Sequence, residues 1–352
     1  MKTKKYIYLI LVLFAAVGCE KIIDFKGKIK EPMLVLNSIV APDSTIKVTV
    51  TESKFFLENA NEFKRIDNAE LTLTVNGENK GTLIKSDSAG TYESNYKLSP
   101  NDVVKIEAKA TGYESVMGLT RLPPKPTILQ VDTTSKTGIT YRTNGMGFNG
   151  YIEVDTLGVY KTLQVRFTMK FKDNADVKNY YRLLVKRRSY LNPENPGGGL
   201  IPDSGYIENY LTYFDDIVFE QNEQSSGFAN SFNNEDNPSG FRFNIFADDL
   251  INGKEYGLKF NDNILLDYRS FIETQPDFPG PEKTVYYIYL QEISSDYYMF
   301  IRSMLSALEK NNNPFIEPVQ IHSNIVNGIG LLGSYTPSEA YIIEINHKET
   351  SP

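Results

Sequence analysis

The chain has 352 residues, a formal net charge of −7, one cysteine and no tryptophan. An acidic balance disfavours a nucleic-acid function, because phosphate binding needs a concentrated basic surface. With 41% hydrophobic and 23% charged residues the chain is typical of a globular protein, and its 23 tyrosines and 20 phenylalanines favour pleated, half-buried strands.

The first 18 residues have the organisation of a secretory signal. Three lysines precede an apolar stretch at 6–17, and small residues lead to Cys19. A membrane-spanning helix needs about 20 apolar residues, so this shorter run is expected to be removed. Gly18 directly before Cys19 resembles the lipobox of bacterial lipoproteins, in which the cysteine sulfur receives a diacylglycerol.

We therefore expect Cys19 to be the lipidated first residue of the mature chain. The alternative is an ordinary secreted protein whose cysteine happens to lie near the cleavage point. Removal of residues 1–18 takes away three lysines and changes the formal charge from −7 to −10. Anionic headgroups would repel such a surface, so the acyl anchor must hold the protein on the membrane. Lipidation also leaves no thiol for a disulfide, a metal site or a nucleophile.

The mature part is long enough for two domains, and its pattern predicts a mostly β protein of two β-sandwiches. Residues 19–32 are charged and form a predicted tether. Residues 33–122 carry short strands with frequent turn signals, as in an Ig-like sandwich. Three prolines mark a stiff linker at 123–127. Residues 128–352 predict a larger antiparallel sandwich with one amphipathic helix at about 295–309.

Two local patterns support this division. Asn76-Gly77 follows an alternating strand and suits the positive φ angles of a tight hairpin turn. In 163–171, every second residue is apolar, which places one side-chain set on a core face. That set is Leu163, Val165, Phe167, Met169 and Phe171.

At the level of whole segments, the chain resembles the DUF4249 lipoproteins of Bacteroidetes bacteria. The most specific segment is NPFIEPVQIHSNIVNGIGLLGSY near the end. The other segments that carry the resemblance are GCE at 18–20, LVLNSIVAPDSTIKVTVTESKFF, NAELTLTVNG, TRLPPKPTI, NYYRLLV, FADDLINGKEYGLKF and SSDYYMFIRS. The resemblance implies an outer-membrane lipoprotein commonly encoded beside TonB-dependent transporters. It implies no reaction and no cofactor.

The sequence contains few candidate catalytic residues. His322 and His347 are the only histidines, and His347 lies in a polar tail, so a histidine triad or a multi-histidine zinc site has almost nothing to use. We interpret His322 as a structural or turn histidine. No phosphate loop, G-x-S-x-G or H-E-x-x-H motif is present.

Acidic and aromatic groupings are the remaining candidates for a ligand site. The acidic ones are Asp215-Asp216, Asp248-Asp249, 172–176 and 233–240. None has the spacing of an EF-hand loop, so solvated turn residues are the favoured interpretation over a calcium site. The tyrosine-rich runs at 286–289 and 297–300 are interpreted as core rather than as a stacking platform. Adjacent strand residues face opposite sides, so only half of 286–289 can face outward, and the helical spacing of 297–300 favours core packing. We expect no metal and no catalytic residue.

These observations favour a non-enzymatic, lipid-anchored outer-membrane accessory or solute-binding protein that serves a TonB-dependent transporter. A structural or adhesive cell-surface module is the first alternative. A carboxylate-dependent hydrolase is the second. The cell surface and the periplasmic face both stay open as locations, and no ligand class is indicated.

Overall fold

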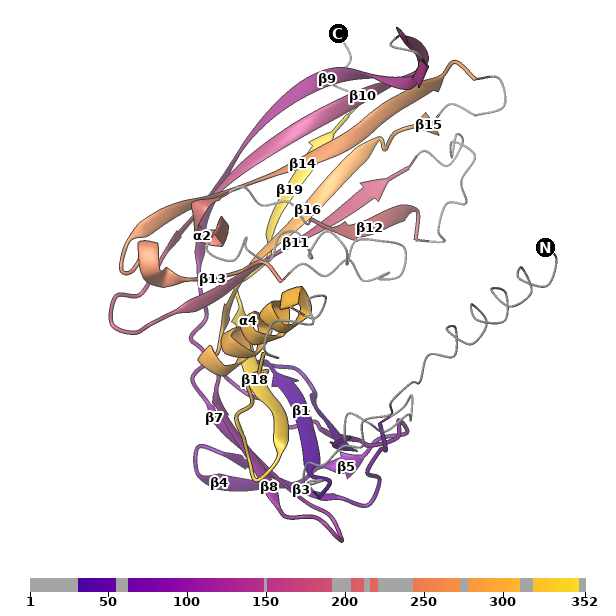
Figure 1. Cartoon of the computed structure of the whole chain (residues 1–352). Helices are drawn as coiled ribbons and strands as arrows, with labels where there is room; N and C mark the ends of the chain where they lie inside the picture. The colour runs from indigo at the N-terminus through magenta and orange to yellow at the C-terminus, as the bar shows by residue number, and fades with distance from the viewer. Residues whose placement is uncertain are drawn as a thin grey trace, which may run out of the picture.

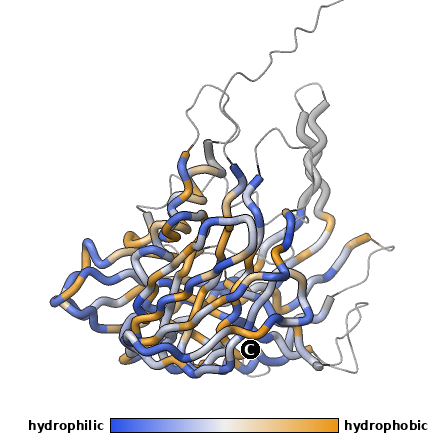
Figure 2. The backbone as a smooth tube through the Cα atoms, turned by 90° about the horizontal axis from the view of Figure 1, so that it is seen from below, coloured by the Kyte–Doolittle hydropathy of each residue, from blue (hydrophilic) through white to orange (hydrophobic). Residues whose placement is uncertain are grey.

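The computed structural model describes residues 31–54, 63–148, 151–191, 204–211, 216–220, 243–272, 278–310 and 319–347. The signal at 1–18, Cys19, Asp215 and the acidic stretch 233–240 lie outside these residues. The described part is mostly β, as predicted, and its strands form two sandwiches, one above the other in Figure 1. Along the strands, hydrophobic residues alternate with hydrophilic ones (Figure 2).

The first sandwich encloses a core made mainly by the N-terminal strands. Its five-stranded sheet contains, in spatial order, β17 (Ile325–Val326), β8 (Val116–Arg121), β7 (Val103–Lys109), β3 (Glu70–Val75) and β4 (Glu78–Thr82). Its second layer contains β18 (Ile329–Pro337), β1 (Leu34–Val40), β2 (Ile46–Glu52), β6 (Thr91–Ser94) and β5 (Ile84–Lys85).

The second sandwich has its own apolar core. One sheet contains β15 (Phe278–Pro279), β14 (Glu255–Ser270), β10 (Tyr151–Lys172) and β9 (Ile128–Phe148). The other layer contains β12 (Tyr206–Tyr210), β11 (Tyr180–Tyr190) and β16 (Lys283–Ile293), with β13 (Ile245–Ala247) beside β11 and β19 (Tyr341–Asn346) beside β16. Short helices at Ile217–Glu220 (α2) and Asp248–Leu250 (η3) lie at its margins, and α4 (Ser295–Lys310) is the long helix.

The predicted hairpin turn, apolar strand face and amphipathic helix are all present in the structure. Asn76 and Gly77 join β3 to β4 with φ angles of 52° and 83°, which is the left-handed conformation that a tight hairpin requires. The five apolar residues of the β10 stripe are at most 1% exposed. The predicted helix at about 295–309 is α4, and the side chain of Ser294 accepts a hydrogen bond from the Tyr297 N–H at 3.4 Å, as an N-cap residue does.

Strand β18 belongs to both sandwiches. Its residues 329–334 pair in parallel with β1, and its residues 335–337 pair with β16 of the second sandwich. The two halves therefore share one continuous ten-stranded sheet. A single boundary at 123–127, with all of 128–352 in the second sandwich, does not describe this arrangement, because Ile325 and Leu332 lie in the first core. Parallel strands need a long connection, and here residues 41–328, which contain strands of both sandwiches, supply it.

The glycine-rich run at 327–333 allows β18 to lie against its neighbours. The backbone of this run lies in close contact with β1. A Cβ on Gly330 would lie 2.1 Å from the Leu36 carbonyl oxygen, and the φ of Gly330 is +123°. A Cβ on Gly328 would lie 2.7 Å from the Leu34 carbonyl oxygen. Side chains at these two positions would push β18 away from β1.

Gly330→Ala is expected to destabilise the protein by more than about 3 kcal/mol, because both backbone strain and overlap with β1 oppose the substitution. Gly112→Ala is the matched control: Gly112 has a φ of +87° but nothing within 4 Å of its added Cβ. The control is expected to cost about 1–2 kcal/mol from strain alone. Urea unfolding of the two variants measures the difference, and equal losses would contradict the close approach of β18 to β1.

Candidate functional site

Helix α4 lies at the junction of the two sandwiches, close to β18 (Figure 1). Its buried side is apolar: Tyr297 and Ile301 share a small core with Leu331 of β18 and Ile293 of β16. Gly333 leaves room for this packing, since a Cβ there would lie 3.0 Å from the Cβ of Tyr297. The helix therefore covers the point where β18 passes from one sandwich to the other.

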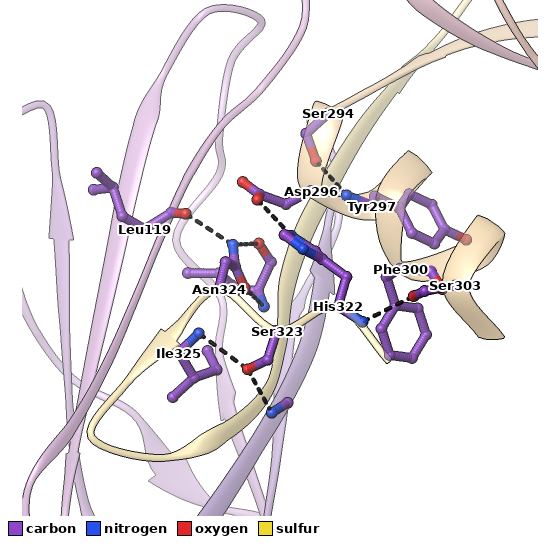
Figure 3. A network of polar contacts seen from close by, with 12 residues as sticks. Leu119, Ser294, Asp296, Tyr297, Phe300, Ser303, His322, Ser323, Asn324 and Ile325 are labelled. Carbon is purple, nitrogen blue, oxygen red and sulfur yellow. Dashed lines mark hydrogen bonds and ion pairs between the residues drawn. The ribbon is translucent and has the colours of Figure 1, made fainter. Parts of the chain in front are cut away.

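A polar network joins α4 to the segment that precedes β17 (Figure 3). His322 Nε2 lies 2.9 Å from Asp296 Oδ1 in the first turn of the helix. Two turns further on, Ser303 Oγ accepts the His322 backbone N–H at 2.8 Å and donates to the Phe300 carbonyl at 3.0 Å. The histidine residue is thus held at both its ring and its backbone, and it docks residues 319–323 onto the helix.

The next two residues extend the network into the first sandwich. Ser323 Oγ accepts the Gly330 N–H at 3.1 Å. The Asn324 side chain donates to the carbonyls of Leu119 at 3.1 Å and Leu332 at 2.9 Å, and it also accepts the Leu332 N–H. Residues 322–324 therefore connect α4, β18 and β8, and they fix the helix relative to the first sandwich.

Asp296, Ser303 and His322 have the residue types of a hydrolytic triad but not its bonding. In a triad the serine hydroxyl donates to the imidazole ring, which accepts the proton during attack. The hydrogen bond that joins Ser303 to His322 runs to the backbone N–H instead. The geometry favours the structural role expected for His322. Sequence reasoning missed Asp296 and Ser303 as its partners, although their spacing of seven residues places them on one helix face.

An open hollow of about 540 Å³ lies beside this network. Its lining mixes apolar and polar side chains from α4 and from 319–323. They are Met299, Arg302, Ser303, Ser306, Val319, Gln320, Ile321, His322 and Ser323. The guanidinium of Arg302 lies 5.6 Å from the ring of Tyr298. Hydroxyl, amide and guanidinium groups here could hold a small polar solute.

The acidic groupings are not all solvated turn residues, which corrects that interpretation. Asp173, Asp216 and Asp248 are 3%, 4% and 0% exposed. Each accepts hydrogen bonds from backbone N–H groups of a neighbouring element, which satisfies its buried charge. The bonds are Gly253 N–H to Asp173 at 2.7 Å, Lys259 N–H to Asp216 at 2.8 Å and Asn179 N–H to Asp248 at 2.8 Å. These carboxylates hold neighbouring segments of the second sandwich together.

Glu292 is a further buried acid, at the end of β16 nearest the junction. It is 7% exposed, and its Oε1 accepts a hydrogen bond from Asn179 Nδ2 at 2.7 Å. Burial, together with the nearby charges of Asp173 and Asp248, raises the pKa of Glu292 to about 7, against the opposing effect of the Asn179 hydrogen bond. Lys178 pairs with Asp248 at 2.6 Å and so places a positive charge beside these carboxylates.

The burial of the second histidine differs from what the sequence predicted. His347 is 8% exposed rather than part of a polar tail, and its Nε2 lies 2.9 Å from the hydroxyl of Thr284. Burial lowers the pKa of His347, which favours the neutral ring. Within the described ranges, no group of three or more histidine, cysteine or acidic side chains has an arrangement that could hold a metal ion.

The tyrosine-rich runs are divided between core and surface. Tyr286 is fully buried, and Tyr297 and Tyr298 are at most 6% exposed. Tyr287 instead faces outward, where the Arg188 guanidinium lies 4.9 Å from its ring and 4.7 Å from that of Tyr206. The expectation of core packing therefore holds for Tyr286, Tyr297 and Tyr298, but not for Tyr287 or for Met299, which is 46% exposed.

Comparison with known proteins identifies a family but no activity. The family model described as "Domain of unknown function (DUF4249)" matches residues 20–340. No curated protein matches the chain. The crystal structure of a candidate membrane-anchored protein from Corynebacterium diphtheriae aligns over 86% of this chain, with 8% identity and a TM-score of 0.19. The chain spans 60% of that structure's length, and so weak a likeness does not bear on fold or function.

Among the residues that the structure describes, no helix combines the length and apolar character needed to span a membrane.

Ser303→Ala is expected to lower the free energy of unfolding by about 1 kcal/mol, because the His322 N–H loses its acceptor. Ser306→Ala is the matched control on the same helix, since Ser306 lines the hollow but forms none of the hydrogen bonds described above. Urea denaturation with tyrosine fluorescence measures both. Equal stability of the two variants would show that the network does not dock the helix.

Glu292→Gln is expected to stabilise the protein at pH 8 but not at pH 4. Because the folded-state pKa of Glu292 is raised from 4.5 to about 7, its contribution to stability is fully present below pH 4.5 and is lost as the pH rises through 7. The loss is roughly 3 kcal/mol at most, and glutamine avoids it because it carries no charge.

Urea unfolding of wild type and Glu292→Gln between pH 4 and pH 9 measures this difference. Glu114→Gln, at an exposed position in the first sandwich, is the matched control and is expected to follow the wild type at every pH. A constant difference between Glu292→Gln and wild type across the range would contradict the buried, titrating carboxyl.

Proposed function

Because the chain belongs to the DUF4249 family, we propose that it is a lipid-anchored outer-membrane protein that serves a TonB-dependent nutrient transporter, as an accessory or by binding solute, without catalysis. The observation that carries the proposal is the leader that directly precedes Cys19, since two or more acyl chains on that residue hold a protein stably on a bilayer. The tether at 19–32 then connects the anchor to β1.

The direction of β1 supports a membrane-anchored role. Val35 lies beside Ile329 and Val40 beside Ser334, and β18 continues from there to β16 of the second sandwich. The start of β1 is therefore at the end of the first sandwich that is farther from the second. An anchor joined to this end leaves the second sandwich and the junction accessible to a partner or a solute.

The hollow beside α4 supports the solute-binding version of the proposal. Pockets for small molecules combine apolar walls with a few polar groups that fix orientation. Met299 and Ile321 supply apolar surface there, and Arg302, Ser306 and Gln320 supply polar groups. A solute that carries an anionic or hydroxyl group would match this lining.

A structural or adhesive role is the second candidate, and the outer face of β11, β12 and β16 favours it. Arg188 lies between the rings of Tyr206 and Tyr287, and Glu208 accepts its Nε–H at 2.8 Å. Tyrosine and arginine are enriched at protein interfaces because they offer large, rigid contact areas with polar tips. A partner protein could contact this face.

Cys19→Ser is expected to abolish incorporation of radiolabelled palmitate and to release the protein from the membrane fraction, because the acyl chains are the anchor. Lys21→Ser, two residues away, is the matched control and should keep both. If Cys19→Ser incorporates no palmitate and still stays in the membrane fraction, that result would contradict the lipid anchor.

The transporter role has a separate test. Gentle detergent solubilisation followed by affinity purification of the wild-type protein is expected to recover a TonB-dependent transporter, and deletion of the protein should impair uptake of that transporter's nutrient. Recovery of no transporter together with normal uptake would overturn this part of the proposal while leaving the anchor intact.

A further inference from the structure

Strand β9 differs from every other strand at the end of a sheet. The other strands at the ends and margins of the three described sheets have two to six residues, which is a common way to limit exposed backbone. They are β4, β5, β12, β13, β15, β17 and β19. β9 has 21 residues. It pairs with β10 along one side, and no described residue pairs with its other side.

The free side of β9 is open over most of its length. Residues 132–142 are exposed, except for the half-buried Gly138. Ile139 and Tyr141 are 63% and 62% exposed, and Leu129 is 50% exposed. The strand contains no proline, and its many threonines favour extended structure. An edge of this length and composition is a template for another strand.

We propose that β9 pairs edge to edge with β9 of a second copy of this chain, antiparallel and with Thr134 on the two-fold axis. The two four-stranded sheets then become one eight-stranded sheet across the dimer. This inference is independent of the transporter role and of any ligand.

Charge complementarity sets the register. With Thr134 on the axis, Asp132 lies opposite the partner's Lys136, and the symmetry repeats the pair. Both residues are on the face of the sheet where Lys170 approaches Asp132 at 3.3 Å, so each Asp132 would lie between two lysines. Opposed charges in a strand pair attract, whereas like charges repel.

Neighbouring registers are less favourable. An axis at Lys136 would place two lysines opposite each other, and an axis at Asp132 would do the same with two carboxylates. An axis at Thr137 would pair Asp132 with the partner's Arg142, but the guanidinium of Arg142 already forms a hydrogen bond with Tyr268. The register at Thr134 also brings Leu129 near the partner's Ile139, so that two exposed apolar side chains meet.

The extent of pairing is sufficient for a specific contact. Residues 128–140 of the two copies would overlap, and antiparallel strands of this length form about a dozen backbone hydrogen bonds, within the range of protein interfaces. The first sandwiches would lie at opposite ends of the dimer.

A single engineered thiol tests the register. Cys19 is the only cysteine, so the mature chain with Cys19→Ser and Thr134→Cys carries one thiol. Opposed residues in an antiparallel pair have Cα atoms about 4.5–5.5 Å apart, within the range of a disulfide. Mild oxidation with copper phenanthroline is expected to give a covalent dimer on a non-reducing gel. Thr168→Cys, on the same face of the interior strand β10, is the matched control and should stay monomeric.

Charge exchange tests the complementarity. Lys136→Asp places two carboxylates opposite each other at two points and is expected to weaken the dimer about tenfold or more in sedimentation equilibrium. Asp132→Lys combined with Lys136→Asp reverses both partners and should restore dimerisation. Lys259→Asp makes the same charge change on β14, away from the edge, and should have no effect.

Three results would overturn the proposal. The first is a wild-type chain that sediments as a monomer at every concentration. The second is faster cross-linking of Thr137→Cys than of Thr134→Cys, which would place the axis elsewhere. The third is a dimer that Lys136→Asp leaves unchanged, which would show that another surface forms it.

Discussion

The parallel pairing of β18 with β1 is the constraint on which the arrangement of the whole molecule depends. The pairing brings the C-terminal part of the chain back into the first sandwich, and it requires Gly328 and Gly330 to lie against the carbonyls of Leu34 and Leu36. The same strand then continues to β16. Neither sandwich can therefore be removed without taking a strand from the other, and the two share one sheet.

Polar groups around the junction reinforce that pairing. Asp296 and Ser303 hold His322, and Asn324 connects the same segment to β8 and β18. On the other side of the junction, buried carboxylates hold neighbouring segments of the second sandwich together through backbone N–H groups. Buried polar groups of this kind specify one arrangement because each leaves an unsatisfied partner when displaced.

Local features of this fold were predictable from the sequence, and long-range ones were not. The apolar alternation through Val165 and Met169, the Asn76-Gly77 turn and helix α4 each depend on neighbours within a few residues. The return of β18 depends on contacts almost 300 residues apart, for which periodicity has no signal. The burial of Asp173 and Asp248 was missed for the same reason: a carboxylate's residue type does not reveal which backbone N–H it accepts. His322 was assigned its structural role, but its partners on α4 were not identified.

Because β18 belongs to both sandwiches, we expect the two sandwiches to unfold together. Hydrogen exchange of the intact chain in increasing urea tests this expectation. If β18 joins the two sandwiches, amides of β1 and of the last residues of β16 will open with the same free energy and the same urea dependence as those of β18. If β1 stays protected under conditions in which β18 and α4 exchange freely, the first sandwich is stable without β18, and the account is wrong.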